Sequence, residues 1–225
     1  HEKEQRMTMV LVTGANRGIG LELCRQFARR GDKVIATCRK DSPELRETGA
    51  EIHEGIELTN DASIHALASE LQGRRIDILV NCAGILTRES LDDLDIDRIR
   101  RQFEINAISP LRVTAALQGC LGRGSKVAII TSRMGSIEDN TSGGYYGYRM
   151  SKAAVNIAAR SLAHDLKDRD VSVFLIHPGM VATEMTGYRG IPPEEAAADL
   201  VVRIDSLGPE DSGTFWHAKG DLLPW

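Results

Sequence analysis

The stretch from Met9 to Gly20 reads MVLVTGANRGIG and decides the fold of this chain. Its first four residues are apolar, which is typical of a buried strand. Beyond the first glycines, Ile19, Leu23 and Phe27 share one face of a helix. The stretch therefore predicts a strand, a glycine turn and a helix, an order that suits phosphate binding at the helix start. The glycine spacing differs from the common G-x-G-x-x-G pattern, so a tight turn without a ligand remains an alternative.

Length and composition limit the classes of protein to which this chain can belong. With 225 residues it suits a single domain, and its formal net charge of −4 disfavours a general nucleic-acid binder. No apolar run approaches the roughly 20 residues that span a bilayer, and the polar N-terminus lacks a signal-peptide core. The four cysteines are scattered and form no C-x-x-C pair. We expect a cytoplasmic, reduced protein that binds neither nucleic acid nor membrane and has no metal site.

The chain divides into a leading segment and one domain. Residues 1–8 form the leading segment, which we expect to be a tag remnant or a disordered end, because the chain begins with His1. Residues 9–225 form a single Rossmann-type domain, since no linker, repeat or low-complexity stretch interrupts them.

Apolar strand patterns alternate with helical patterns along the domain. Besides the opening strand, the strand-like segments are residues 33–38, 51–58, 76–80, 126–130, 171–176 and 213–216. The helical segments are residues 17–30, 61–72, 97–118, 145–168 and 193–206. This alternation predicts a three-layer, doubly wound α/β fold of the Rossmann type, with about seven parallel strands and helices on both faces. Ligands of such sheets bind beyond the carboxyl ends of the strands.

Small and polar residues recur where the predicted strands end. The fourth strand leads into Asn81-Cys82-Ala83-Gly84, the fifth into Thr131-Ser132, and the sixth into His177-Pro178-Gly179. Because parallel strands place these ends along one edge, the residues converge there with the glycine turn. Packing alone does not explain the recurrence, so we expect a binding site at this edge.

The residues after the second predicted strand indicate which dinucleotide fits. An NAD site places Asp or Glu about 20 residues beyond the glycines, at the ribose 2′-hydroxyl. Here Arg39 occupies that region and can hold a 2′-phosphate, joined by Arg17 from the glycine turn. Asp32 and Asp41 are rival acids, but both lie off the expected position. We therefore predict NADP(H) rather than NAD(H), with solvated surface cations as the alternative.

Tyr148 and Lys152 form the clearest catalytic pattern. On a helix, residues i and i+4 share one face, so Lys152 lies one turn from Tyr148. A tyrosine hydroxyl with its ordinary pKa of about 10 is a poor proton carrier at neutral pH, and a nearby ammonium lowers that pKa. The pair then serves as a general acid and base. Such pairs are also common on exposed helix faces, so the assignment depends on the neighbouring motifs.

Together these motifs resemble those of the short-chain dehydrogenases/reductases. The matching residues, in family order, are Thr13-Gly14-x-x-x-Gly18-x-Gly20, Asn81-Cys82-Ala83-Gly84, Asn106, Ser132, Tyr148-x-x-x-Lys152, Pro178-Gly179 and Thr183. The segments Thr131–Ser136, Tyr148–Ala154 and Leu223–Trp225 are further similar to the bacterial C-factor proteins and related NADPH-dependent carbonyl reductases. Two positions depart from the family pattern: Cys82 replaces its second Asn, and Glu57 stands where it has Asp.

The resemblance implies roles for individual residues. As catalytic residues it implies that Tyr148 donates the proton, Ser132 stabilises the oxyanion, Lys152 holds the nicotinamide ribose, and Asn106 positions a water. As cofactor contacts it implies Gly14, Asn16, Arg17, Gly18, Ile19, Gly20, Arg39, Glu57, Leu58, Asn81, Ala83, Gly84, Tyr148, Lys152, Pro178, Gly179, Val181 and Thr183. The implied reaction is the reduction of an aldehyde or ketone with NADPH, or its reverse.

The sequence defines the substrate side less well. Only eight residues separate Thr183 from Pro192, which predicts a short loop and an open cleft with a broad substrate range. The C-factor resemblance leaves a second class open, a signalling or NADP(H)-sensing protein with weak or no turnover. NADPH oxidation with a panel of carbonyl compounds separates the two. Family members often pair through the helices at 97–118 and 145–168, so the resemblance also implies a homodimer.

Overall fold

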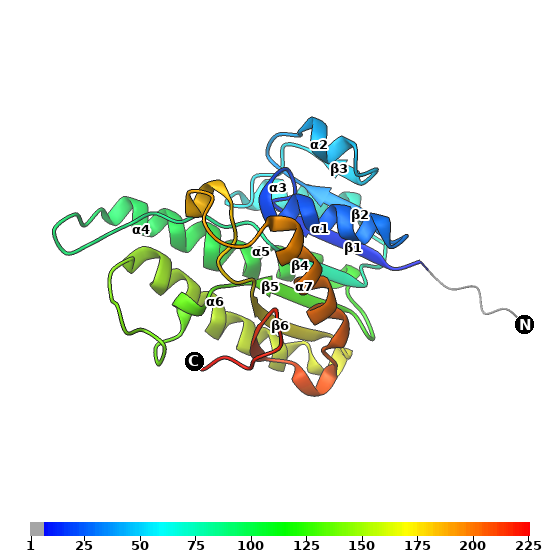
Figure 1. Ribbon diagram of the computed structural model, residues 1–225. Coiled ribbons are helices and arrows are strands. Elements are labelled where there is room, and N and C mark those ends of the chain that lie inside the picture. The colour runs from blue at the N-terminus through cyan, green and yellow to red at the C-terminus, as the bar shows by residue number, and fades with distance from the viewer. Residues whose placement is uncertain (1–6) are drawn as a thin grey trace, which may run out of the picture.

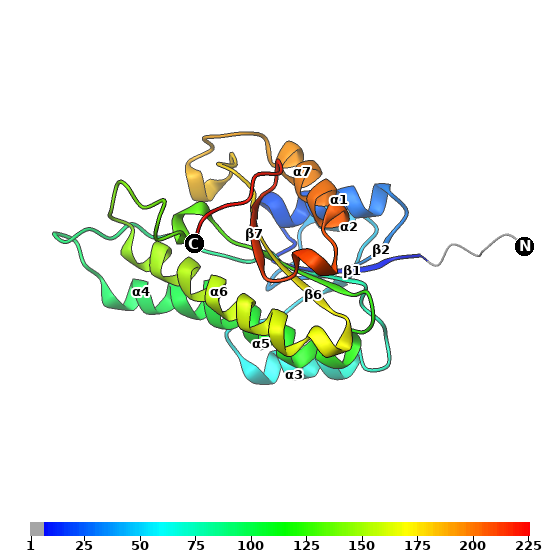
Figure 2. The same cartoon turned by 90° about the horizontal axis from the view of Figure 1, so that it is seen from below.

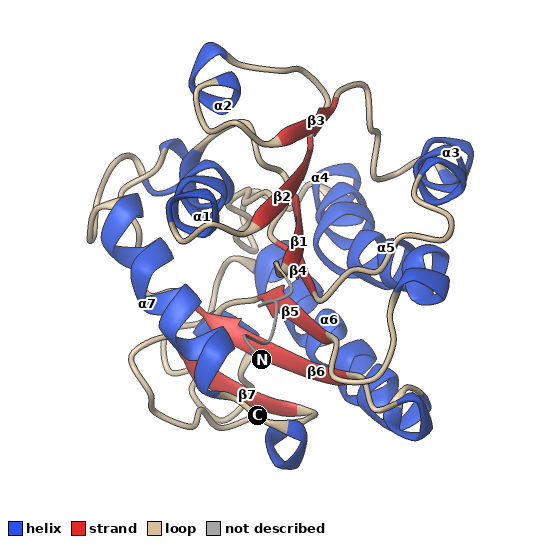
Figure 3. Ribbon diagram, turned by 90° about the vertical axis from the view of Figure 1, so that its right-hand side faces the viewer, coloured by secondary structure: helices blue, strands red, loops and turns tan. Residues whose placement is uncertain are grey.

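Seven parallel strands form one sheet within residues 7–225, the part of the chain that the computed structural model describes. Their order is β3-β2-β1-β4-β5-β6-β7, which can be followed in Figure 3. The strands are β1 (Met9–Thr13), β2 (Lys33–Thr37), β3 (Glu51–His53), β4 (Ile78–Asn81), β5 (Lys126–Ile130), β6 (Ser172–His177) and β7 (Thr214–His217). The predicted doubly wound, parallel α/β fold is confirmed.

Helices cover both faces of the sheet, as Figure 2 shows. One face carries α1 (Gly18–Arg29) and α7 (Pro193–Ser206), with the short α2 (Pro43–Arg46) beside them. The opposite face carries α3 (Asp61–Glu70), α4 (Ile96–Phe103), α5 (Ser109–Leu117) and α6 (Tyr146–Asp165). In Figure 1 the loop before α4 extends away from the sheet. Among residues 7–225, no helix is both long and apolar enough to cross a membrane.

The alternation of side chains along the strands builds two apolar layers. On β1, Leu11 packs toward α3, α5 and α6, whereas Val10 and Val12 face α1 and α7. Phe27 of α1 and Ile204 of α7 are fully buried in that second layer. Because both faces are covered, the central strands are apolar nearly throughout.

The third predicted strand is shorter than the sequence pattern indicates. The pattern extends over residues 51–58, but β3 ends at His53. Gly55 adopts a φ of 78°, a left-handed conformation that interrupts an extended strand and turns the chain. The residues that follow therefore form a loop that leads into α3.

The long predicted helix at residues 97–118 is interrupted by a wider turn. α4 is followed by a π-helical segment, Glu104–Ile108, and then by α5. Pro110 has no amide hydrogen and cannot donate the α-helical bond to the carbonyl of Asn106. Single π-helical turns are frequent at functional sites, and this one contains Asn106. The short α2 is a further element that the sequence pattern did not indicate.

The strand order reverses between β1 and β4. The chain proceeds from β1 outward to β2 and β3, then returns to β4 and continues in the other direction. Doubly wound sheets bind their ligands at such a reversal, beyond the carboxyl ends of the strands. Most of the predicted leading segment, residues 1–6, lies outside the described residues.

Candidate active site

Close backbone contacts hold the glycine turn after β1. Gly14 and Gly18 adopt φ values of 65° and 55°, in the left-handed region that favours glycine. A Cβ on Gly14 would lie 2.9 Å from the Cα of Ala83, and one on Gly20 would lie 2.2 Å from the Gly14 carbonyl oxygen. The turn therefore packs against the segment after β4 at a distance that no side chain would allow.

The other predicted residues of the turn connect it to its surroundings. The carbonyl of Asn16 accepts a hydrogen bond from Ser42 Oγ at 3.1 Å, which ties the turn to α2. Ile19 is partly buried and packs against the apolar layer between the sheet and α1 and α7. The turn is thus fixed on both sides.

The first turn of α1 leaves its amides without a side-chain cap. Arg17 is the N-cap residue but makes no capping hydrogen bond, and the first turn contains no acidic residue. By contrast, Ser42, Asn60 and Asp95 cap α2, α3 and α4 through their side-chain oxygens. The amides and the positive dipole end of α1 therefore remain available to an anion.

The ends of β1 and β4 are tied together beside this turn. The hydroxyl of Thr13 accepts hydrogen bonds from the amides of Cys82 at 3.0 Å and Ala83 at 3.4 Å. The Asn81 side chain donates to Thr114 Oγ1 at 3.3 Å, toward α5. The Asn81–Gly84 segment is therefore held from both the sheet and the helix layer.

Asn106 holds the loop that follows this segment. Its side chain is buried, and its Nδ2 donates to the Ile85 carbonyl at 2.8 Å and to Ser151 Oγ at 3.0 Å. Its Oδ1 accepts from the Ile85 amide at 2.9 Å. A Cβ on Gly84 would lie 3.4 Å from Asn106 Oδ1 and 3.7 Å from Lys152 Nζ. Asn106 and Lys152 therefore flank Gly84, whose missing side chain leaves room between them.

The structure brings Tyr148, Lys152 and Ser132 together. All three are nearly buried, with 8%, 5% and 7% of their surfaces exposed. Lys152 Nζ lies 5.6 Å from the centroid of the Tyr148 ring and donates to the Ile130 carbonyl at 3.1 Å. A Cβ on Gly135 would lie 2.8 Å from the carbonyl carbon of Lys152, so this glycine lets the turn after β5 approach α6.

The proton affinities of Tyr148 and Lys152 differ from the sequence-based expectation. Burial raises the pKa of Tyr148, and a hydrogen bond with Ser132 opposes that shift only in part. Burial also lowers the pKa of Lys152 to about 8. The expectation that Lys152 brings the Tyr148 pKa below its ordinary value is therefore wrong for this structure, because desolvation dominates. At neutral pH the Tyr148 hydroxyl is protonated, which is the form that can donate a proton.

The segment after β6 also approaches the glycine turn. Gly179 turns the chain with a φ of 88°, and the buried Val181 pairs with Ile191 in an isolated bridge. A Cβ on Gly18 would lie 3.4 Å from Thr183 Cγ2. Predicted cofactor residues from distant parts of the sequence therefore meet at this edge.

His177, the last residue of β6, packs against His217 of β7. The ring centroids lie 5.1 Å apart in an edge-to-face arrangement, and Nδ1 of His177 has no hydrogen-bond partner among residues 7–225. Burial, followed by the charges of His217, Arg133 and Lys152, lowers the pKa of His177 to about 3. His177 is therefore neutral at physiological pH, directly before Pro178.

The two cations predicted for a 2′-phosphate differ in their surroundings. Arg39 is exposed after β2 and forms no ion pair within residues 7–225. Arg17 pairs with Glu184, and these side chains are 66% and 70% exposed. The rival acids Asp32 and Asp41 are each paired with a neighbouring arginine. Arg39 can therefore meet a phosphate directly, whereas Arg17 must first leave Glu184.

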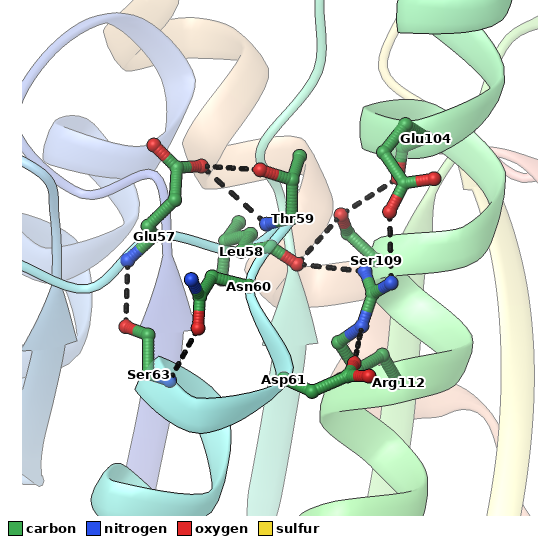
Figure 4. A network of polar contacts seen from close by, with 9 residues as sticks. All are labelled: Glu57, Leu58, Thr59, Asn60, Asp61, Ser63, Glu104, Ser109 and Arg112. Atoms are coloured by element: carbon green, nitrogen blue, oxygen red, sulfur yellow. Dashed lines mark hydrogen bonds and ion pairs between the residues drawn. The ribbon is translucent and has the colours of Figure 1, made fainter.

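Glu57 and Leu58 belong to a polar network that joins the loop after β3 to α5 (Figure 4). The Glu57 carboxylate accepts from the Thr59 hydroxyl at 3.0 Å and so stays on its own loop. The Leu58 carbonyl accepts from Ser109 Oγ at 3.0 Å and from Arg112 at 2.9 Å. Arg112 also pairs with one carboxylate of α3 and one of the π-helical segment. The network fixes this loop against the helix layer.

The residues behind the first turn of α6 were not predicted from the sequence. A Cβ on Gly147 would lie 2.2 Å from Gln102 Nε2, and Gln102 contacts the buried Glu89. The available signal is a glycine inside a helical pattern, immediately before Tyr148, because such a glycine often marks close packing.

Comparisons with known proteins identify the family of this chain. The family model for short chain dehydrogenases matches residues 8–191. A 1-hydroxy-2-glutathionyl-2-methyl-3-butene dehydrogenase from Rhodococcus sp. is 45% identical over 226 residues, which covers 97% of this chain and 100% of that protein. The C-signal protein of Myxococcus xanthus is 42% identical over 166 residues, which covers 72% of this chain and 100% of that protein.

A solved structure is similar over nearly the whole chain. The NADPH-bound carbonyl reductase from chicken fatty liver superimposes with a TM-score of 0.88 at 28% identity, covering 98% of this chain and 100% of that one. The fold and the sequence relatives agree. The chain belongs to the short-chain dehydrogenase family and is an oxidoreductase of CH–OH and C=O groups.

Proposed function

We propose that this protein reduces an aldehyde or ketone with NADPH, or catalyses the reverse oxidation of an alcohol. The observation that carries the proposal is the buried group of Tyr148, Ser132 and Lys152, at the same sheet edge as the uncapped start of α1. The similar chicken carbonyl reductase is NADPH-bound, which supports the same cofactor here.

The residues at the sheet edge fit a dinucleotide. The left-handed Gly14 and Gly18, with the free amides of α1, suit a pyrophosphate. Arg39 suits a 2′-phosphate, because its guanidinium forms no ion pair in the described part of the chain. Val181 and Thr183, beyond the turn, suit the nicotinamide carboxamide. When bound, NADPH supplies the hydride.

Residues of this chain handle the proton and the developing charge. The Tyr148 hydroxyl, whose pKa burial raises, is protonated at neutral pH and can donate its proton to the substrate oxygen. Ser132 Oγ accepts from the Met134 amide at 3.1 Å, and its hydroxyl can turn from the hydrogen bond with Tyr148 to donate to the developing oxyanion. The product alcohol gains a hydride at carbon and a proton at oxygen. Lys152, with a pKa of about 8, and Asn106, across Gly84, suit the return of a proton to Tyr148.

We further propose that the substrate carries an acidic substituent beside an apolar skeleton. The Rhodococcus relative acts, by its name, on an alcohol that bears a glutathionyl group. Arg88, Arg149 and Arg189 lie on segments that follow β4, β5 and β6, and none pairs with a carboxylate within residues 7–225. Met180 and Tyr188, 63% and 74% exposed, provide apolar surface after β6. This combination of cations and apolar side chains supports an anionic conjugate.

The homodimer implied by the family resemblance is also a proposal. Leu111 on α5 and Met150 and Ile157 on α6 are 42%, 48% and 66% exposed. Apolar side chains on these helices support pairing of two chains through this layer.

Replacement of the proposed acid tests the reaction. We expect Tyr148→Phe to lower kcat by about 10²–10⁴-fold in NADPH oxidation with a panel of carbonyl compounds, because the proton donor is lost while the ring is kept. Tyr146→Phe, at a half-buried tyrosine two residues earlier in α6, is the matched control and should keep native turnover. Retention of most of the kcat in Tyr148→Phe would contradict the assignment.

Because the chain is similar to C-signal, the alternative function of an NADP(H) sensor must also be tested. The presence of Ser132, Tyr148 and Lys152 together favours an enzyme, because a sensor does not need all three. Tight NADPH binding without turnover of any carbonyl compound, or of a glutathionyl alcohol with NADP⁺, would favour the sensor.

A further inference from the structure

Glu89 lies buried behind the first turn of α6, although it belongs to the exposed loop between β4 and α4. Only 3% of its surface is exposed, whereas its neighbours Arg88 and Ser90 are exposed. Its Oε2 accepts from the amide of Gly147 at 3.2 Å, and its backbone carbonyl accepts from the amide of Tyr145 at 2.9 Å. Glu89 thus binds two amides at the start of α6, one with its side chain and one with its backbone.

A buried glutamine completes the contact. Gln102 Nε2 lies 3.4 and 3.3 Å from the two carboxylate oxygens of Glu89, and Gln102 Oε1 accepts from the Thr87 amide at 3.0 Å. The Thr87 hydroxyl donates to Glu89 Oε1. Both oxygens therefore accept hydrogen bonds, as those of an ionised carboxylate do. Within residues 7–225 no Lys or Arg pairs with Glu89, so these donors and the positive end of α6 compensate its charge.

α6 has no cap from its own sequence. Its N-cap residue, Tyr145, makes no side-chain capping bond and adopts a φ of 52°, a conformation that is costly for a tyrosine. The first turn of α6 also contains no acidic residue. A Cβ on Gly147 would lie 2.2 Å from Gln102 Nε2 and 3.1 Å from Glu89 Oε2, so a larger residue here would displace these side chains. The next residue is Tyr148.

We propose that Glu89 is a positioning residue, which fixes the first turn of α6, and with it Tyr148, against the loop after β4. The proton donor and this loop then keep one relative position while substrate binds and product leaves. The effect on turnover rests on the proposed function, whereas the anchoring of α6 does not.

Three variants separate the anchoring from the fold as a whole. Glu89→Ala removes the acceptor. Glu89→Gln keeps an acceptor for Gly147, and its amide can donate to the Thr87 hydroxyl once that group rotates. Asp92→Asn, at an exposed position of the same loop, removes the same charge and is the matched control.

We expect Glu89→Ala to lower kcat about tenfold or more, with the Kd for NADPH within about twofold of native, because the first turn of α6 and Tyr148 move whereas the glycine turn after β1 does not. Glu89→Gln should recover kcat to within about threefold, since the hydrogen bonds matter more than the charge. Asp92→Asn should match the native protein. Native kcat in a folded Glu89→Ala variant would overturn the proposal, as would an equal loss in Glu89→Gln and Glu89→Ala. If Glu89→Ala does not fold, the kcat of Glu89→Gln decides: a value within about threefold of native supports the proposal, and a larger loss overturns it.

Amide hydrogen exchange gives a readout that does not depend on turnover. Exchange over residues 146–149 should be about tenfold faster in Glu89→Ala than in Asp92→Asn, because the Gly147 amide loses its acceptor. Equal exchange in the two variants would overturn the anchoring. Faster exchange in a protein whose native form reduces no carbonyl would contradict the proposed function and leave the anchoring in place.

Discussion

The two halves of the site differ in the groups that interact with charge. The glycine half, residues 13–20, offers backbone amides of α1 that no side chain caps. The catalytic half buries titratable side chains, and burial brings the pKa of Lys152 to about 8 and that of His177 to about 3. Steric constraint shapes the first half and desolvation shapes the second. An added methyl group should therefore damage the glycine half most, whereas a change of pH should affect the catalytic half most.

The largest effect is expected from Gly14→Ala. The new Cβ would lie 2.9 Å from the Ala83 Cα, at a φ of 65°, so both contact and conformation are unfavourable. We expect the Kd for NADPH to rise at least about tenfold and the free energy of unfolding to fall by about 1–3 kcal/mol. Titration of NADPH fluorescence and urea unfolding measure the two effects.

Gly73→Ala is the control for this substitution. Gly73 has a φ of 78° but nothing within 4 Å of its Cβ position, so it reports the conformational cost alone. If the free energy of unfolding fell equally in the two variants, contact with Ala83 would be unimportant. The steric explanation of the glycine half would then be wrong.

A smaller effect is expected from acid. The pKa of His177 is about 3 in the folded chain against the ordinary 6.5, so below pH 6.5 the unfolded chain binds a proton that the folded chain does not. The free energy of unfolding therefore falls as the pH falls from about 6.5 toward 3, by about 2 kcal/mol between pH 7 and pH 5 from this group. Urea unfolding at both pH values measures it.

His177→Phe should remove this part of the pH dependence, because a phenyl ring can pack against His217 but cannot take up a proton. His65→Gln, at an exposed histidine, is the control and should keep the native slope. An unchanged slope in His177→Phe would show that burial of His177 does not set the acid sensitivity of the catalytic half.

The smallest effect is expected at Arg39, on the rim of the glycine half. Arg39→Ala should reduce the preference for NADPH over NADH, as the ratio of kcat/KM values, by about tenfold. Arg17→Ala should reduce it less, because Arg17 already pairs with Glu184. A larger change in Arg17→Ala than in Arg39→Ala would reverse this assignment.

The difference between the halves also explains which features of the site could be predicted from the sequence. Glycine spacing, apolar strands and the Tyr148–Lys152 interval are local patterns, and they predicted the seven-stranded parallel sheet and the proximity of Lys152 to Tyr148. The direction of the Tyr148 pKa shift depends on burial by distant elements, which spacing does not show. The sequence therefore pointed to Tyr148 and Lys152, but the predicted direction of the Tyr148 pKa shift was wrong.

Other differences arise from single residues whose effect is local but easily missed. Gly55 ends the third strand by its left-handed conformation, and Pro110 widens the helix around Asn106. The contact between Glu89 and Gly147 joins positions 58 residues apart, so no window along the sequence would show it. The sequence indicates this contact only through Gly147, a glycine within a helical pattern.

Because the start of α1 is uncapped, the free energy of unfolding can depend on the anions dissolved around the protein. Ser42, Asn60 and Asp95 cap the first amides of α2, α3 and α4, whereas α1 has no side-chain cap. A ligand that binds these amides only in the folded state raises the free energy of unfolding by about 2.7 kcal/mol at one hundred times its Kd. An anion bound to these amides would therefore make the folded chain more resistant to unfolding by heat or denaturant.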